Sequence, residues 1–191
     1  MSLKGTQTEK NLACAFAGES MARNRYTFFA EVAKKQGYEQ IAQLFIETAE
    51  NEKVHANYFW SQIKGLGSVK IETEVPACGV NDTLTNLRNA AAGEYAEHTT
   101  DYPHFADVAE KEGFAKIAKA FRGIAAVEKE HEIRFNTLAK QVESSTVFKR
   151  EAVVAWKCRN CGYVVRAKVA PKACPVCFKP QGWFEIKEVL E

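Results

Sequence analysis

The chain has no long hydrophobic run, and its first eleven residues, Met1 to Asn11, are polar. A transmembrane helix needs about 18 consecutive apolar residues, and a secretory leader needs an apolar core, so the sequence favours neither. The formal net charge is only +2, which gives no sign of the basic surface of a nucleic-acid-binding protein. We therefore expect a cytoplasmic globular protein without membrane or nucleic-acid partners.

Cysteine is rare outside one short segment. Cys14 and Cys78 stand alone, and we expect both to be inert thiols, because free cysteine most often packs as a small apolar side chain. The other four form two Cys-x-x-Cys pairs with twelve residues between them: Cys158, Cys161, Cys174 and Cys177. Two matched pairs argue against a catalytic dithiol and predict a tetrahedral tetrathiolate site for one iron or for zinc. The ligands alone do not distinguish these metals.

The segment that carries the four cysteines is too short to fold without its metal. A short β-like stretch, Val153–Trp156, precedes the first cysteine. The aromatic residues that can pack around the metal site are Trp156, Tyr163, Trp183 and Phe184. We place a domain boundary near residue 147, which gives a helical domain at 1–147 and a small metal domain with four cysteine ligands at 148–191.

The rest of the chain is an internal repeat with an offset of 76 residues. The sequence Glu-Lys-Val-His at 52–55 returns as Glu-Lys-Glu-His at 128–131, and residues 29–38 align with residues 105–114. Each copy reads as two helices joined at Gly37 or Gly113, where glycine suits the left-handed residue that ends a helix. Apolar residues recur at steps of three and four in all four segments, which predicts the inward faces of a helical bundle.

A linker, Gly65–Val80, separates the two copies and is too long for a tight turn between helices. About 16 extended residues reach about 50 Å, and a helix of about 30 residues is about 45 Å long. The linker can therefore run the length of the bundle. The predicted fold is an all-α, ferritin-like four-helix bundle with one long crossover, followed by a small C-terminal β domain that carries the cysteine knuckles.

Carboxylates and histidines lie within the inward faces rather than opposite them. A Glu and a His three residues apart share one helix face, and two such pairs plus a Glu from each of two other helices is the ligand set of a two-metal carboxylate bundle. The candidate metal ligands are Glu19, Glu52, His55, Glu94, Glu97, Glu128 and His131. The alternative is a bundle with solvated glutamates and core histidines, but two matched copies disfavour it, because buried carboxylates that repel one another need cations.

The repeat is broken at one place. Tyr26 lies seven positions after Glu19, but the equivalent Tyr102 lies eight positions after Glu94. One extra residue in a helix is commonly absorbed as a π-bulge, often at a functional site. Pro103 follows directly and favours a kink.

The same stretch contains Glu97, which has no carboxylate counterpart in the first copy. It is either a seventh ligand or a surface charge. Tyr26 and Tyr102 occupy equivalent positions in the two copies. They either hydrogen-bond to the ligands and the reacting oxygen species or are ordinary core tyrosines. We count Glu97, His55, Tyr26 and Tyr102 as the candidate catalytic residues.

The whole chain resembles the rubrerythrin family. The resemblance rests on both Glu-x-x-His motifs, on Ala-Gly-Glu-Ser at 17–20, Arg-Asn-Arg-Tyr at 23–26, Gly-Glu-x-x-Glu at 93–97, Tyr-Pro at 102–103 and Cys-Arg-Asn-Cys-Gly-Tyr at 158–163. It implies a non-haem di-iron domain joined to a rubredoxin-type iron site, and reduction of hydrogen peroxide to water in oxidative-stress defence.

The resemblance also implies roles for individual residues. Glu52 and Glu128 would bridge two irons, Glu19 would bind one iron, and Glu94 with His131 would bind the other. On reduction one iron would exchange Glu97 for His55. The relay iron would be held by Cys158, Cys161, Cys174 and Cys177.

The resemblance further implies a head-to-tail homodimer, in which exchange of helices is possible. The sequence contains no Gly-x-Gly-x-x-Gly strand–turn–helix unit. Electrons would therefore come from a rubredoxin or a separate NAD(P)H reductase.

The sequence leaves two competing functions open. A ferroxidase or iron-storage bundle would prefer dioxygen and would have no use for a one-electron relay. A non-redox binding protein would carry zinc rather than iron at the cysteines. The physiological electron donor, the metals bound in vivo and activity on organic peroxides are not encoded in any motif that we recognise.

Overall fold

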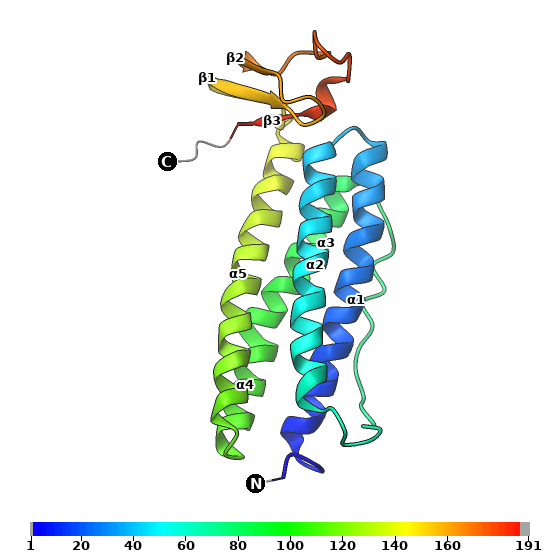
Figure 1. Cartoon of the computed structure of the whole chain (residues 1–191), viewed down its shortest axis with the longest axis vertical. Coiled ribbons are helices and arrows are strands. Elements are labelled where there is room, and N and C mark those ends of the chain that lie inside the picture. The colour runs from blue at the N-terminus through cyan, green and yellow to red at the C-terminus, as the bar shows by residue number, and fades with distance from the viewer. Residues whose placement is uncertain (1, 188–191) are drawn as a thin grey trace.

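The computed structural model describes residues 2–187, and its helices form an elongated bundle with the β domain at one end (Figure 1). Helix α1 (Gln7–Lys35) and helix α2 (Glu39–Gln62) form the first antiparallel pair. The second pair consists of helix α5 (Ala115–Glu143) and a composite third rod. This rod comprises α3 (Thr83–Ala96), a π-helical turn η1 (Glu97–Asp101) and α4 (Tyr102–Lys111).

The turns within each pair are the ones predicted from the repeated glycines. Gly37 and Gly113 have φ values of 81° and 83°. Just beyond Gly37, Tyr38 N donates a 2.9 Å hydrogen bond to Ala33 O, and the Phe114 N bond to Ala109 O is equivalent at 2.7 Å. These bonds satisfy carbonyls that the helix ends leave free. The left-handed glycines therefore set the hairpin geometry of both copies.

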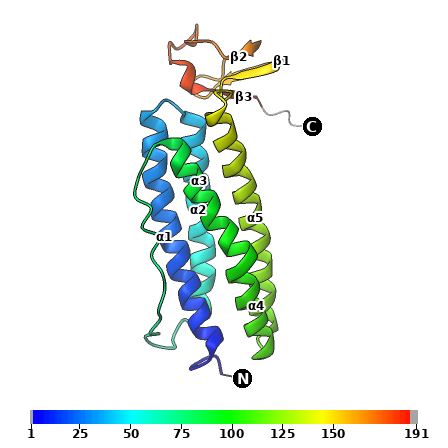
Figure 2. The same cartoon turned by 180° about the vertical axis from the view of Figure 1, so that it is seen from behind.

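The linker between the two pairs runs along the outside of α1, from one end of the bundle to the other (Figures 1 and 2). The Cys14 thiol on α1 lies 3.7 Å from the carbonyl oxygen of Glu72 in the linker. Helix α3 then begins at the far end, where the Asp82 side chain accepts a hydrogen bond from Thr85 N. The predicted ferritin-like topology with one long crossover is confirmed.

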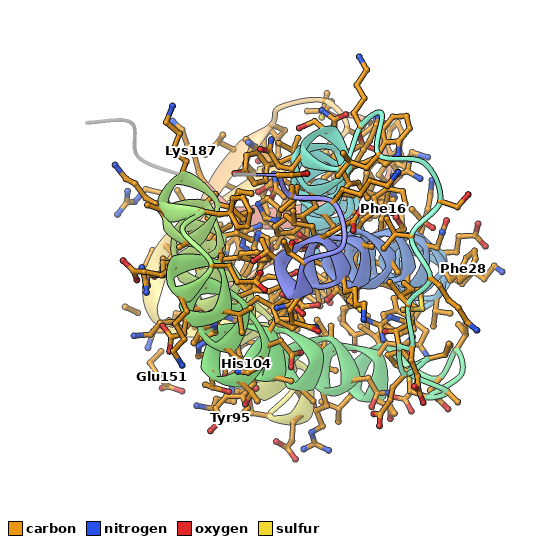
Figure 3. All side chains as sticks on the ribbon, turned by 90° about the horizontal axis from the view of Figure 1, so that it is seen from below. Phe16, Phe28, Tyr95, His104, Glu151 and Lys187 are labelled. Carbon is orange, nitrogen blue, oxygen red and sulfur yellow. The ribbon has the colours of Figure 1, made fainter. Side chains whose placement is uncertain are left out.

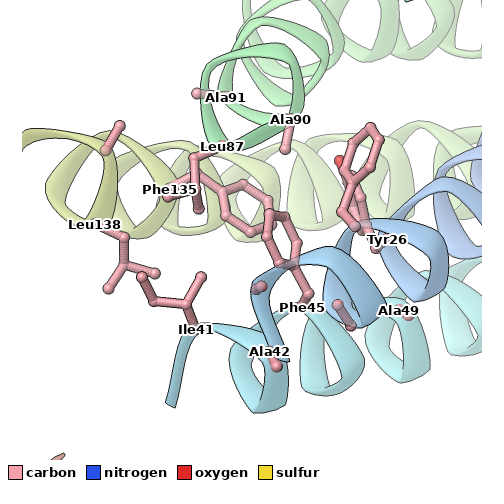
Figure 4. Close-up of a cluster of buried hydrophobic side chains, with 14 of the residues drawn as sticks. Tyr26, Ile41, Ala42, Phe45, Ala49, Leu87, Ala90, Ala91, Phe135 and Leu138 are labelled. Atoms are coloured by element: carbon pink, nitrogen blue, oxygen red, sulfur yellow. The ribbon is translucent and has the colours of Figure 1, made fainter. Parts of the chain in front are cut away.

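Two apolar clusters fill the bundle and leave a polar layer between them. One lies toward the β domain and includes Tyr26, Phe45 and Phe135, as Figure 4 shows. The other lies toward the opposite end and includes Leu12, Phe59 and Phe121. Viewed along the bundle, side chains such as Phe28 and Tyr95 point away from the axis (Figure 3). The polar layer thus occupies the middle of a well-packed core.

The C-terminal domain is a three-stranded antiparallel sheet of order β2-β1-β3. Its strands are β1 (Lys149–Cys158), β2 (Val164–Val169) and β3 (Phe184–Ile186), and a 3₁₀ turn, η2 (Gln181–Trp183), precedes β3. Strand β1 is longer than the predicted Val153–Trp156 stretch. The predicted aromatic core is present, with Trp156 and Phe184 buried and Tyr163 and Trp183 partly buried.

This domain packs directly on the turn between α1 and α2. The backbone of Gly182 approaches Gly37 so closely that any side chain at Gly182 would clash with the Gly37 carbonyl. Beside it, the rings of Tyr38 and Phe148 stack with centroids 6.0 Å apart. The predicted division at residue 147 falls between α5 and β1 and stays a prediction. Within residues 2–187, no helix has the length and apolar character needed to cross a membrane.

Candidate metal centre

Six buried side chains from the four rods of the bundle meet in the polar layer between the two apolar clusters. They form two overlapping groups in which one ligand atom from each residue lies within 4.8 Å of all the others. The first group is Glu19, Glu52, His55 and Glu128, and the second is Glu52, Glu94, Glu128 and His131. Because Glu52 and Glu128 belong to both groups, the geometry is that of two adjacent cation sites that share two carboxylates.

Several polar atoms in this layer approach one another closely without hydrogen bonding, although His55 Nδ1 does share a 3.0 Å hydrogen bond with Glu52 Oε2. His131 Nδ1 lies 2.7 Å from Glu128 Oε2 and 3.1 Å from Glu52 Oε1, yet it makes no properly directed hydrogen bond. Both oxygens of Glu128 are also buried without a hydrogen-bond partner. Buried polar atoms are rarely left unsatisfied. Close approach without hydrogen bonding is what metal ligands show, so these residues fit a pair of cations.

Electrostatics support the same conclusion. Burial, followed by repulsion from Glu97 and the other carboxylates, raises the pKa of Glu19 and of Glu94 well above the ordinary value. Burial lowers the pKa of a histidine, but contacts with Glu128 and Glu52 outweigh it and raise the pKa of His55 to about 10 and of His131 to about 9. In the absence of metal, protons therefore take the place of the missing positive charge.

This proton uptake predicts a pH-dependent stability for the metal-free protein. The pKa values of Glu19 and Glu94 are raised from 4.5 and those of His55 and His131 from 6.5, so the folded state binds more protons than the unfolded chain. The histidine contribution is complete below about pH 6.5 and is lost as the pH rises through about 9 to 10. We expect the thermal midpoint to fall by roughly 5–10 °C between pH 6 and pH 9.

Differential scanning calorimetry of the metal-free protein measures this midpoint. The metal-loaded protein serves as the control and should lack the trend, because bound cations displace the same protons. A midpoint that rises between pH 6 and pH 9 in the metal-free protein would contradict the prediction.

Each tyrosine of the repeat donates a hydrogen bond to a carboxylate of the other repeat copy. Tyr102 donates to Glu19 Oε1 at 2.5 Å, and Tyr26 donates to Glu94 Oε1. All four side chains are buried. The two bonds cross the bundle between α1 and the composite third rod. They fix one oxygen of each terminal carboxylate and leave the other oxygen, Oε2, without a hydrogen-bond partner.

Glu97 stands apart from the six. It is the first residue of the π-helical turn, so the extra residue of the second copy is absorbed as predicted. Its side chain is half-buried and belongs to neither group of candidate ligands. Burial, followed by repulsion from Glu128 and Glu52, raises its pKa well above the ordinary value. The structure thus brings together six of the seven predicted bundle ligands and places the seventh beside them.

The contacts of the side chains in and around this turn were not predicted from the sequence. His98 Nε2 lies 2.7 Å from Glu132 Oε2 on α5, and Asn136 Nδ2 donates to Glu132 Oε1 at 3.0 Å. Arg25 on α1 lines a cavity together with Glu97. No sequence pattern pairs His98 with Glu132.

The four C-terminal cysteines form the second candidate site. The Cys158 and Cys177 sulfurs are 3.6 Å apart, as are those of Cys161 and Cys174, and the four are within ligand distance of one another. Cys158 and Cys174 are fully buried, whereas Cys161 is exposed. Hydrogen bonds from Gly162 N to Cys158 O and from Phe178 N to Cys174 O close the two knuckles. This is a tetrathiolate metal site with one edge toward solvent.

A ferritin-like bundle with a two-cation carboxylate centre, joined to a tetrathiolate domain, defines a class of iron-binding oxidoreductases. The family model described as Rubrerythrin matches residues 10–139, and that described as "Rubrerythrin, rubredoxin-like domain" matches residues 156–185. The chain belongs to the rubrerythrin family, whose members bind iron in a di-iron domain and a rubredoxin-like domain.

Individual relatives cover nearly the whole chain. A rubrerythrin of Porphyromonas gingivalis is 57% identical over 184 residues, which is 96% of this chain and 92% of the relative. Rubrerythrin-1 of Clostridium acetobutylicum is 53% identical over 188 residues, which is 97% of this chain and 96% of the relative. A solved structure of nigerythrin in a mixed-valent state has a TM-score of 0.65 and 29% identity, and the match covers 98% of this chain and 91% of nigerythrin.

Proposed function

We propose that this protein is a peroxidase that reduces hydrogen peroxide to water at a di-iron centre in the bundle. The overall change is H₂O₂ + 2 e⁻ + 2 H⁺ → 2 H₂O. The observation that carries the proposal is the pairing, in one chain, of a buried two-cation carboxylate site with a tetrathiolate site. The first suits two-electron chemistry on a small oxidant, and the second suits one-electron transfer.

In this proposal Glu52 and Glu128 would be shared by the two irons, since they are the residues common to both groups. Glu19 and His55 would complete one position, and Glu94 and His131 would complete the other. Glu97 would take the place of His55 as a ligand in the oxidised protein. Iron as the metal is supported by a solved structure of nigerythrin, 30% identical to this chain, that is described as fully reduced and all ferrous.

Bound ferrous iron would supply the two electrons and the Lewis acidity that the reduction needs. The protein must supply position and protons. Tyr26 and Tyr102 hold the terminal carboxylates in place through their hydrogen bonds to Glu94 and Glu19. Glu97 borders a cavity that opens toward solvent, and burial together with repulsion from Glu128 and Glu52 raises its pKa, which favours the protonated carboxyl group. It is therefore suited to deliver a proton to a departing oxygen.

The tyrosines permit a test of this division of roles. In Tyr102→Phe, Glu19 loses the hydrogen bond from Tyr102, and we expect peroxide reoxidation of the reduced protein to slow roughly tenfold or more. Iron content should stay unchanged, because the carboxylate remains. Tyr58→Phe is the matched control, since Tyr58 has no carboxylate partner among the described residues. Equal rates in both variants, measured by stopped-flow absorbance, would argue against a role for Tyr102.

Electron transfer from the tetrathiolate site to the di-iron centre would take place between two copies of the chain. The β domain sits on the Gly37 turn, whereas Glu52 lies thirteen residues beyond the start of α2 at Glu39, or about 20 Å along the helix. The two sites of one chain are thus at different levels of the bundle. A head-to-tail homodimer, with or without exchange of helices, would place one subunit's relay site beside the other's di-iron centre. A rubredoxin or an NAD(P)H reductase would then reduce the relay.

A stopped-flow comparison of oxidants tests the function. The chemically reduced, iron-loaded protein is mixed with hydrogen peroxide or with dioxygen, and the return of ferric absorbance is followed. We expect peroxide to be the faster oxidant by at least tenfold at equal concentration. Faster oxidation by dioxygen, with more than three irons accumulating per chain, would favour a ferroxidase instead. A colourless tetrathiolate site in protein purified without added metal would indicate zinc and remove the electron relay.

A further inference from the structure

A large cavity lies beside the di-iron layer, between α1, the linker and the composite third rod. Its volume is about 760 Å³, and its walls include Arg25 from α1, Glu74 from the linker and Glu97 from the π-helical turn. Figure 2 shows the face of the molecule on which α3 and α4 cross beside α1 and the linker. The cavity therefore borders Glu97, and none of the six buried ligands lines it.

Arg25 is placed within this cavity so that its guanidinium lies next to the Glu97 face of the third rod. A Cβ added to Gly93 would be 3.8 Å from Arg25 Nη2. Gly93 and Glu97 are four residues apart, so they lie on one face of the rod, one turn from each other. The 3.8 Å separation is an ordinary van der Waals distance, so the guanidinium lies against this turn of the rod. Arg25 Nε is buried and has no hydrogen-bond partner among the described residues, so the arginine has an unused donor.

The charges that act most strongly on Glu97 are negative, with the exception of Arg25. Glu128, Glu52 and Asp101 all oppose its ionised form, and Arg25 is the cation that favours it. A carboxylate that leaves a metal ligand position carries its negative charge with it. Such a carboxylate needs a cation nearby to remain ionised in a partly dry cavity. Arg25 is suitably placed to provide it.

We propose that Arg25 is a positioning residue for Glu97: its guanidinium receives the Glu97 carboxylate in this cavity and so holds it away from the di-iron centre in the reduced protein. This inference rests on the proposed exchange of Glu97 with His55. It adds a role for a residue outside the ligand set. Arg25 sets the balance between the two positions of Glu97, whereas the bound metals provide the competing attraction.

Arg23, two residues earlier on the same helix, provides a comparison. Its guanidinium pairs with Glu50 at 3.5 Å, and both side chains are more than a third exposed. An exposed pair of this kind contributes little. Arg23→Met therefore removes the same charge from α1 without touching the cavity, and it is the matched control for Arg25→Met.

The test is a double-mutant cycle on the reduction potential of the di-iron centre in the full-length, iron-loaded protein. Without Arg25, Glu97 stays on the metal more often, and an added anionic ligand favours the ferric state. We expect Arg25→Met to shift the exchange about tenfold, which lowers a one-electron potential by about 59 mV. Arg25→Lys should retain most of the wild-type value, and Arg23→Met should match wild type.

The Glu97→Gln background decides whether Arg25 acts through Glu97. If it does, the shift caused by Arg25→Met is largely lost when Glu97 is already replaced. An equal shift in both backgrounds would show that Arg25 acts only as a nearby charge and would overturn the proposal. No shift in either background would overturn it as well.

A second measurement needs no variant. A crystal structure of the wild-type protein loaded with Zn²⁺, which cannot be oxidised, shows where Glu97 rests when the metals are divalent. We expect its carboxylate in hydrogen-bond contact with Arg25, directly or through one water. Glu97 bound to Zn²⁺, or turned toward solvent, would overturn the proposal. Failure of the proposed peroxidase activity would instead appear as unreactive wild-type protein, whatever the position of Glu97.

Discussion

Replacing Glu128 with alanine is expected to empty the bundle of both metals and to abolish peroxide reduction. Glu128 is the fully buried residue of α5 that belongs to both groups of candidate ligands and approaches both histidines, at 2.9 Å from His55 and 2.7 Å from His131. Its loss removes a ligand from each position at once. Metal catalysis is worth several kcal/mol of barrier lowering, so we expect the rate to fall by roughly a thousandfold or more.

Iron analysis and visible spectroscopy distinguish this result from simple unfolding. Glu128→Ala should retain one tetrathiolate iron per chain and a helical circular dichroism spectrum, because the apolar clusters on either side of the polar layer are untouched. Glu130→Gln is the control, since Glu130 is exposed on the same helix and belongs to neither ligand group. Retention of two bundle irons in Glu128→Ala would show that Glu128 does not bridge the metals.

The second large effect is expected at the tetrathiolate site. Cys174→Ser replaces a fully buried sulfur, and we expect the β domain to lose its metal and unfold while the bundle stays folded. Structural metal sites of this size contribute roughly 10–16 kcal/mol to folding, more than a sheet of three strands with one buried tryptophan can replace. Limited proteolysis should then cleave the chain after residue 148 and spare α1–α5.

The same variant separates the two halves of the proposed reaction. Steady-state turnover with an external donor should fall by at least a hundredfold, because the relay is gone. Chemically reduced Cys174→Ser should still be reoxidised by peroxide in a single turnover at close to the wild-type rate. Cys14→Ser is the control, since Cys14 lies on α1 outside the cysteine site. Wild-type steady-state turnover in Cys174→Ser would mean that electrons bypass the tetrathiolate site.

The fold was open to prediction because its signals are local and repeated. The spacing of Glu94 and Tyr102 against Glu19 and Tyr26 revealed the extra residue, and the structure absorbs it as the π-helical turn at Glu97–Asp101. The left-handed glycines at both hairpins were visible for the same reason. Helical period alone also placed the six buried ligands on inward faces, since a residue's face follows from its position along the helix.

Contacts between distant elements were not predictable in this way. The Glu132 partner of His98 and the cavity shared by Arg25 and Glu97 depend on how α1, α5 and the third rod are rotated against one another. Arg23 is a further example, because its pairing with Glu50 near the surface does not follow from its position along α1. Long side chains can reach from a boundary position either inward or outward, so period alone does not decide their direction.

The single inserted residue makes the two halves of an otherwise doubled molecule unequal. Glu19 and Glu94 are matched by a pseudo-two-fold relation, but Glu97, which begins the π-helical turn, has no carboxylate counterpart in the first copy. Two chemically distinct iron nuclei are therefore to be expected in a Mössbauer spectrum, with one quadrupole doublet that changes on reduction far more than the other. One extra amino acid in the second copy would thus distinguish an iron whose ligands stay the same from an iron whose ligands change on reduction.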